Sequence, residues 1–228
     1  MHSHDHKFIY VHIPKSAGTF VKHYLLSNIE PEYKNNQNQQ DYDDKYNVTC
    51  ERSLNAIASE IPDHKDYFKF TVVRNPFDRV VSMFSYLGGW KFDYFIENNI
   101  DSPMMPYVKK FHSYYLSDDF DGFIKYAYEE EAVRKFHSGY YDNYIDRIKI
   151  KGEVAIDQFY KMENINGCLF SLKETLGFDN SSGFNDWRKN SSSDYKKKAS
   201  YREYYSDYSR EYIGDHFYRD LEYFGYGF

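Results

Sequence analysis

The sequence predicts an α/β fold in which a parallel β-sheet is flanked by helices. Two observations support this prediction. The chain holds two strand–turn–helix units, FIYVHIPKSAGTFVKHYLLSN at 8–28 and FKFTVVRNPFDRVVSMF at 68–84, and strands keep alternating with helices after them. Such alternation favours a parallel sheet with ligands at the carboxyl ends of the strands. At 228 residues, we expect a single domain over 1–228 with a sizeable core.

The first unit reads as a strand from Phe8 to Ile13, a tight loop, and a helix from Gly18 to Ser27. The loop, PKSAGT, brings a lysine, two hydroxyls and a glycine to one point. A helix N-terminus adds unpaired N–H donors and a partial positive charge, which attract a phosphate. An ordinary strand–helix turn is the alternative for this loop alone.

The second unit has a well-marked helix start. Its strand, Tyr67 to Val73, is rich in aromatic and β-branched residues, as a buried strand requires. Asn75 is suited to the N-cap, Pro76 to the first helical position and Asp78 to the first turn. We therefore expect the helix to begin directly after the strand.

Arg74 ends this second strand, and Ser82 lies two turns into the helix. Arginine matches a phosphate bidentately, and serine can add a neutral donor. The alternative is an Arg74–Asp78 pair across the turn. For Arg79, packing or a surface ion pair is the preferred interpretation.

The remaining segments complete the alternation. We expect a mobile polar excursion at about 30–48 and a mostly helical insertion at 88–150. The other elements predicted are helices at 54–61, 122–136, 165–176 (ending at Gly177) and 206–224, and a strand at 153–160.

Composition excludes some classes of protein. There are 29 Lys plus Arg against 35 Asp plus Glu, a net charge of −6, which disfavours a nucleic-acid or anionic-membrane binder. No segment has the roughly 20 apolar residues of a membrane span, and the N-terminus does not resemble a signal peptide. The two cysteines, Cys50 and Cys168, form no CxxC motif, so we expect a reduced, cytoplasmic compartment.

HIPKSAGTF after a strand, followed by FTVVRNPFDRVVS, resembles the 5′-phosphosulfate and 3′-phosphate motifs of the sulfotransferases. The form HIPK…T together with VRNPFDR is closest to the carbohydrate class, the heparan- and chondroitin-type enzymes. KDYFKF, DQFYKMENI and the closing DLEYFGYGF also look like landmarks of that family. The resemblance thus covers most of the chain, although only the two motifs are specific.

The resemblance implies 3′-phosphoadenosine 5′-phosphosulfate as the donor and no metal. The residues that match the 5′-phosphosulfate loop are Lys15, Ser16, Ala17, Gly18, Thr19 and Phe20, and those that match the 3′-phosphate pair are Arg74 and Ser82. Lys15 matches the lysine that stabilises the leaving phosphate. The reaction implied is an in-line displacement that relies on positioning and charge stabilisation.

The base that activates the acceptor is less well marked. Many relatives carry a histidine between the two motifs, and Glu51 occupies roughly that place here. A carboxylate can accept a hydroxyl proton, especially where burial raises its pKa. His64 and His137 are rivals. The late loop around 188–198 either closes over the nucleotide, as in relatives, or is a solvated basic segment.

We therefore expect a sulfotransferase acting on a hydroxyl of a carbohydrate acceptor. The alternatives are a nucleotide kinase-like phosphate-loop enzyme and an inactive donor- or carbohydrate-binding module. A kinase loop places its lysine after the glycines and needs an acidic magnesium ligand, whereas here the lysine comes first. The acidic net charge makes a neutral or weakly anionic glycan the easier acceptor.

Overall fold

The structure is a computed structural model that describes residues 1–30, 32, 33, 39–48, 52–136, 138–178, 195 and 198–228. The chain divides into two compact units. The first comprises Met1–Arg74 and Tyr144–Lys189, and the second comprises Asn75–Asn143 and Asn190–Phe228.

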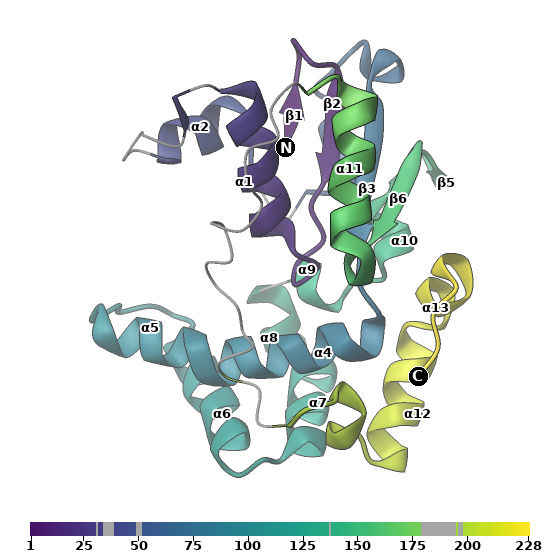
Figure 1. Cartoon of the computed structure of the whole chain (residues 1–228). Coiled ribbons are helices and arrows are strands. Elements are labelled where there is room, and N and C mark those ends of the chain that lie inside the picture. Colours follow the sequence, from purple (N-terminus) through teal and green to yellow (C-terminus); the bar gives the residue numbers. More distant parts are fainter. Residues whose placement is uncertain (31, 34–38, 49–51, 137, 179–194, 196–197) are drawn as a thin grey trace. The chain divides into compact units, whose positions relative to one another are not determined.

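The first unit is built on a four-stranded sheet in the order β1-β2-β3-β6 (Figure 1). Three of its strands are parallel, so that Tyr10 lies opposite Phe70 and Thr71 opposite Phe159; a short antiparallel strand adds to one edge. The strands are β1 His2–Ser3, β2 Phe8–Val11, β3 Phe68–Val73 and β6 Gln158–Lys161. The predicted α/β class with a mainly parallel sheet is confirmed.

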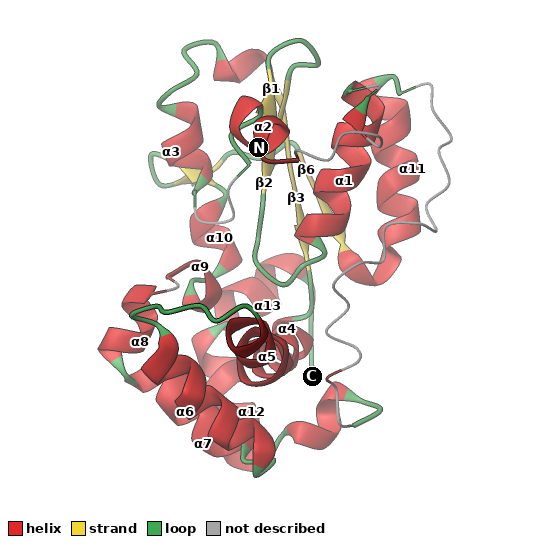
Figure 2. Ribbon diagram, turned by 90° about the vertical axis from the view of Figure 1, so that its left-hand side faces the viewer, coloured by secondary structure: helices red, strands yellow, loops and turns green. Residues whose placement is uncertain are grey.

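Helices flank both faces of this sheet. Figure 2 shows α1 (Gly18–Ile29) and α11 (Ile165–Leu176) on one face, and α3 (Leu54–Ala58) and α10 (Tyr144–Arg147) on the other. The unit also contains α2 Gln39–Lys45, η2 His64–Asp66 and η4 Met162–Asn164. Alternate strand residues form the core together with α1 and α11. The strands contribute Phe8, Tyr10, Phe70 and Val72, and the helices contribute Val21, Leu25, Leu169 and Leu172.

The strand predicted at 153–160 is wrong as a single element. β5 (Glu153–Val154) pairs antiparallel with β4 (Lys149–Ile150), whereas β6 joins the main sheet. The turn between β4 and β5 has positive φ at both central residues, 51° at Lys151 and 92° at Gly152, which is the geometry of a tight hairpin. One β-rich segment is therefore divided between two different sheets.

The second unit is helical. Within residues 75–143 it contains α4 Pro76–Ser85, η3 Tyr86–Trp90, α5 Lys91–Glu97, α6 Met105–Leu116, α7 Phe120–Glu129, α8 Glu131–Phe136 and α9 Ser138–Tyr141. Near the C-terminus follow η7 Tyr201–Tyr204, α12 Asp207–His216 and α13 Tyr218–Phe224. None of the described helices combines the length and apolarity that a bilayer-spanning helix requires.

Two predicted helices of this unit are each interrupted. The one expected at 122–136 is broken at Glu130, which is extended, and the one at 206–224 at Phe217. The interruptions let α4, α6, α7 and α12 share one aromatic core, whose central members include Phe84, Phe111, Phe120, Phe123, Ile213 and Phe217. Core packing has overridden local helix propensity at both points.

Candidate active site

The loop between β2 and α1 has an unusual backbone. Lys15 and Ala17 have positive φ angles of 65° and 59°, whereas Ser16 and Gly18 do not. For residues with a side chain, such angles cost about 1–3 kcal/mol each and persist only where the surroundings enforce them. Left-handed residues in such a loop can turn neighbouring N–H groups toward one point, a concave arrangement that binds anions.

Helix α1 adds its own donors to this point. Its N-cap, Ala17, supplies no side-chain hydrogen bond, and its first turn contains no acidic residue. The N–H groups of the first helical turn have no partner within a helix. Thr19 presents an exposed side chain in this turn, and Phe20 is half-buried. The start of α1 thus keeps its positive end open to an anion.

Ser16 is the sharpest mark of a ligand in the loop. Its side chain is fully buried, and its Oγ has no hydrogen-bond partner. A buried hydroxyl left unpaired costs about 1–3 kcal/mol. The residues of the loop therefore fit a group that brings hydrogen-bond acceptors to Ser16.

Two cations converge on the same loop. Arg74, which follows β3, is 7% exposed, and its Nη1 donates to the Lys15 carbonyl at 3.1 Å. Burial first, and the charge of Arg74 second, lower the pKa of Lys15 from 10.5 to about 7. The arrangement favours a bound anion, since negative charge would offset both effects.

Arg74 is held in place through its backbone as well. The Tyr144 hydroxyl, at the start of α10, donates to the Arg74 carbonyl at 3.0 Å. The second predicted member of the 3′-phosphate pair, Ser82, is buried in α4.

Arg79 has a structural role, as the sequence indicated. It is 1% exposed and donates to the carbonyls of Gly139 at 3.1 Å, Tyr140 at 2.5 Å and Asp142 at 3.5 Å. It thereby ties the end of α9 to α4 within the second unit.

Of the three candidates for the base, Glu51 and His137 lie outside the described residues. His64 lies in η2, at the amino end of β3, whereas Lys15 and Arg74 follow the carboxyl ends of β2 and β3. Six strand residues separate the two edges, or about 20 Å at 3.3 Å per residue. This distance disfavours His64 as the base.

Most of the late loop at 188–198 also lies outside the described residues. At its end, Lys198 forms an ion pair with Asp118 at 3.1 Å and donates to the Glu203 carbonyl at 3.1 Å. Lys198 thus anchors this end of the loop within the second unit.

Sequence reasoning missed a histidine at the same loop. His12 directly follows β2, and its ring lies so close to Gly18 that a Cβ there would stand 1.6 Å from its Nε2. The ring also stacks on Tyr10, at 5.9 Å between centroids and 14° between planes. The signal in the sequence was its position, three residues before Lys15 at the end of a buried strand.

A buried arginine near this loop was also missed. Arg147, at the end of α10, is 3% exposed and donates to the Arg52 carbonyl at 3.4 Å. Its charge, like that of Lys15, helps to lower the pKa of His12. The carboxyl edge of the sheet is therefore strongly basic, although the chain as a whole has a net charge of −6.

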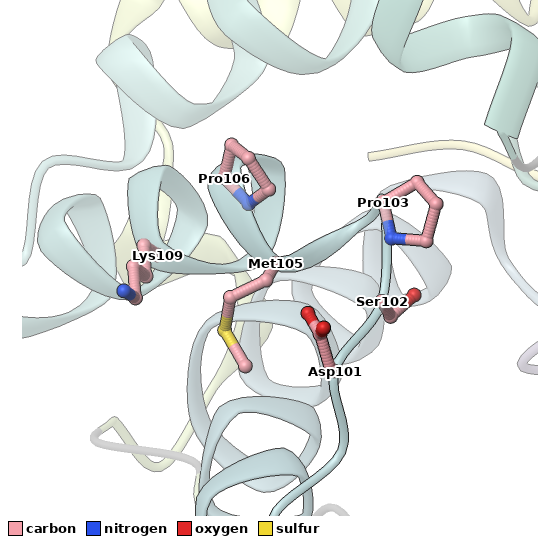
Figure 3. A pocket seen from close by; sticks show the side chains of 6 residues that line it. All are labelled: Asp101, Ser102, Pro103, Met105, Pro106 and Lys109. Atoms are coloured by element: carbon pink, nitrogen blue, oxygen red, sulfur yellow. The ribbon is translucent and has the colours of Figure 1, made fainter.

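A pocket in the second unit contains none of these residues. It is formed by the segment that precedes α6 and by the first turns of α6, and its lining residues are Asp101, Ser102, Pro103, Met105, Pro106 and Lys109 (Figure 3). Over the described residues, no group of three or more His, Cys, Asp or Glu could hold a metal ion. The anion loop of the first unit is thus the better-supported site.

Comparison with known proteins identifies the family. The model of the sulfotransferase family matches residues 1–227. No match was found among curated proteins or among solved structures. The match extends over nearly the whole chain, including both strand–loop–helix units, and the chain therefore belongs to the sulfotransferase family.

Proposed function

We propose that this protein transfers a sulfuryl group from 3′-phosphoadenosine 5′-phosphosulfate to a hydroxyl of a carbohydrate. Family membership supports sulfuryl transfer to a hydroxyl-bearing acceptor. The observation that carries the choice of donor is the loop in which the unpaired Ser16 hydroxyl is buried between Lys15 and Ala17. The phosphosulfate-binding role of this loop, similar to a P-loop in its placement, belongs to the proposal.

Each residue of the loop would have a distinct task. The backbone N–H groups from Ser16 to Phe20 and the hydroxyls of Ser16 and Thr19 would hold the 5′-phosphosulfate. Lys15 would stabilise the charge that develops on the bridging oxygen as the S–O bond breaks. Arg74 and Ser82 would hold the 3′-phosphate, and Glu51 stays a prediction for the base.

The choice of a carbohydrate acceptor is supported by the resemblance of the two motifs to the carbohydrate class. A net charge of −6 favours a neutral or weakly anionic glycan over a highly sulfated one, because like charges repel. A kinase-like enzyme is the weaker candidate, since β3 is followed by Arg74 and Asn75 rather than by an acidic magnesium ligand.

Calorimetric titration with 3′-phosphoadenosine 5′-phosphate, beside ATP with magnesium, tests the donor. We expect binding of the bisphosphate without metal and loss of that binding in Arg74→Ala. Arg210→Ala, which removes an arginine whose side chain is 52% exposed, serves as the matched control and should bind normally. Binding of ATP with magnesium alone would refute the proposal and favour the kinase.

Transfer itself is then measured by mass spectrometry with 3′-phosphoadenosine 5′-phosphosulfate and unsulfated glycans. An increase of one sulfate group in a glycan supports the carbohydrate acceptor. Binding of the bisphosphate with no transfer to any hydroxyl compound, water included, would favour the inactive module.

A further inference from the structure

His12 combines three properties that the function proposed above does not yet use. The first is its place: it directly follows β2, and the Nε2 edge of its ring lies against Gly18, the first residue of α1. No side chain larger than that of glycine would leave room for the imidazole there. His12 is therefore part of the same loop that holds Lys15 and the buried Ser16.

The second property concerns the hydrogen bonding of its ring nitrogens. Over the described residues, His12 makes no hydrogen bond, and the residue is half-buried. The stacking on Tyr10 fixes the plane of the ring without engaging either nitrogen. A neutral imidazole presents one lone pair and one N–H, so His12 can accept a proton from a hydroxyl group.

The third property is its charge state. Burial first, and then the positive charges of the Met1 amine, Arg147, Lys22 and Lys15, lower the pKa of His12 to about 3. These charges come from the chain's first residue, from α10, from α1 and from the loop itself; of these groups, Lys22 is paired with Asp43 at 2.9 Å. The ring is thus unprotonated in the free protein, and an anion in the loop would weaken the cationic field and make the ring more basic.

We propose that His12 is the base that accepts the acceptor's proton, an inference that rests on the proposed sulfuryl transfer. The acceptor oxygen forms a bond to sulfur while the bond from sulfur to the 5′-phosphate oxygen breaks. The hydroxyl proton moves to a ring nitrogen of His12, and the electron pair of the broken bond stays on the phosphate oxygen beside Lys15. The imidazolium then returns its proton to water.

Hydrolysis of 3′-phosphoadenosine 5′-phosphosulfate tests this without knowledge of the glycan, because water serves as the acceptor. We expect His12→Gln and His12→Ala to release sulfate about 10²–10⁴-fold more slowly, with affinity for 3′-phosphoadenosine 5′-phosphate kept. Imidazole added to His12→Ala should restore part of the rate. His64→Ala, at the opposite edge of the sheet, is the matched control and should leave the rate unchanged.

A spectroscopic measurement supports or contradicts the same role. NMR titration of the His12 ring should give a higher pKa in the complex with the bisphosphate than in the free protein. An unchanged rate of sulfate release in a His12→Gln variant that still binds the bisphosphate would overturn the inference. A loss of sulfate release in Glu51→Gln but not in His12→Gln would overturn it as well. Failure of the unaltered protein to bind the bisphosphate would instead refute the proposed function.

Discussion

Lys15 is a lysine whose charge depends on what occupies its loop. Its pKa of about 7 reflects burial and the nearby Arg74, and a bound anion should raise the pKa again. Binding of 3′-phosphoadenosine 5′-phosphate should therefore be accompanied by proton uptake at pH 8, because the free lysine is mostly neutral there. Affinity should fall as the pH rises above 7.

Calorimetry in two buffers of different ionisation enthalpy measures this uptake. Lys15→Met should lose it, whereas Lys22→Met, which removes the cation paired with Asp43, should keep it. Equal uptake in both variants would place the titrating group elsewhere.

Without ligand, the depressed pKa of Lys15 has a second effect. The free energy of unfolding should rise from pH 7 to about 10.5, because over this range the unfolded chain still binds the proton that the folded chain has lost.

Gly18 is required by its neighbour rather than by its own φ angle. A Cβ at this position would stand 1.6 Å from the His12 ring, so Gly18→Ala must displace the imidazole. We expect the variant to lose about 1–3 kcal/mol of stability through overpacking and to lose turnover. Urea unfolding and sulfate release measure the two effects.

Gly214→Ala provides the matched comparison for Gly18→Ala. Gly214 lies inside α12, and a Cβ there meets only the Phe77 ring at 3.8 Å. Because alanine is the better helix former, this change should stabilise the protein by roughly 0.5–1 kcal/mol. Destabilisation of equal size in both variants would contradict the role assigned to His12 at Gly18.

At the scale of single elements, the start of α4 shows how much a short sequence can determine. Asn75 accepts a hydrogen bond from the Phe77 N–H at 3.0 Å, and Pro76 takes the first helical position, both as predicted. The Asn75 side chain also donates to the Gly227 carbonyl at 2.7 Å, a long-range contact that the local pattern could not reveal.

These two bonds predict different effects for two substitutions. Asn75→Ala should cost about 1 kcal/mol for the lost cap and about 1 kcal/mol more for the bond to Gly227. Asn75→Asp should keep the cap and lose the bonds that the amide donates to the Gly227 carbonyl and, at 3.4 Å, to the Tyr201 hydroxyl. Urea unfolding of both variants checks this; equal losses would show that the cap contributes nothing.

Elements were predictable where a local signal was complete. The helix α11 begins and ends as predicted, because Asn164 caps it and Gly177 takes the left-handed conformation. The π-helix η3 was not predicted, and its closest contacts are with the distant α6: a Cβ on Gly88 would stand 2.5 Å from that of Tyr115, and His112 Nδ1 bonds the Gly88 carbonyl at 2.6 Å. Such contacts between helices are absent from local sequence.

For the molecule as a whole, the sequence predicted the fold class and the family, because two motifs and the alternation of elements were enough. The buried Arg147 and the open His12 could not be predicted, since a single arginine or histidine in sequence gives no sign of burial or of partners. Composition gave no sign of this basic edge of the sheet either, because the net charge of −6 describes the whole chain and not one site.

Binding of a ligand to that edge should stabilise the folded protein. A ligand that binds only the folded state contributes about 2.7 kcal/mol at 100 times its Kd, and for a chain of this size each kcal/mol corresponds to roughly 2–4 °C in Tm. We therefore expect 3′-phosphoadenosine 5′-phosphate to raise the Tm by roughly 5–11 °C at that concentration.

The shift should depend on the residues that bear the proposed phosphate contacts. Scanning calorimetry at the same ligand concentration should show almost no shift in Arg74→Ala, because the guanidinium lost is the one that lies beside Lys15. Ser82→Ala should keep part of the shift, since a neutral donor contributes less than a charged one. A full shift in Arg74→Ala, or an equal shift with ATP and magnesium in the unaltered protein, would show that the ligand binds elsewhere and that the basic edge of the sheet is not the nucleotide site.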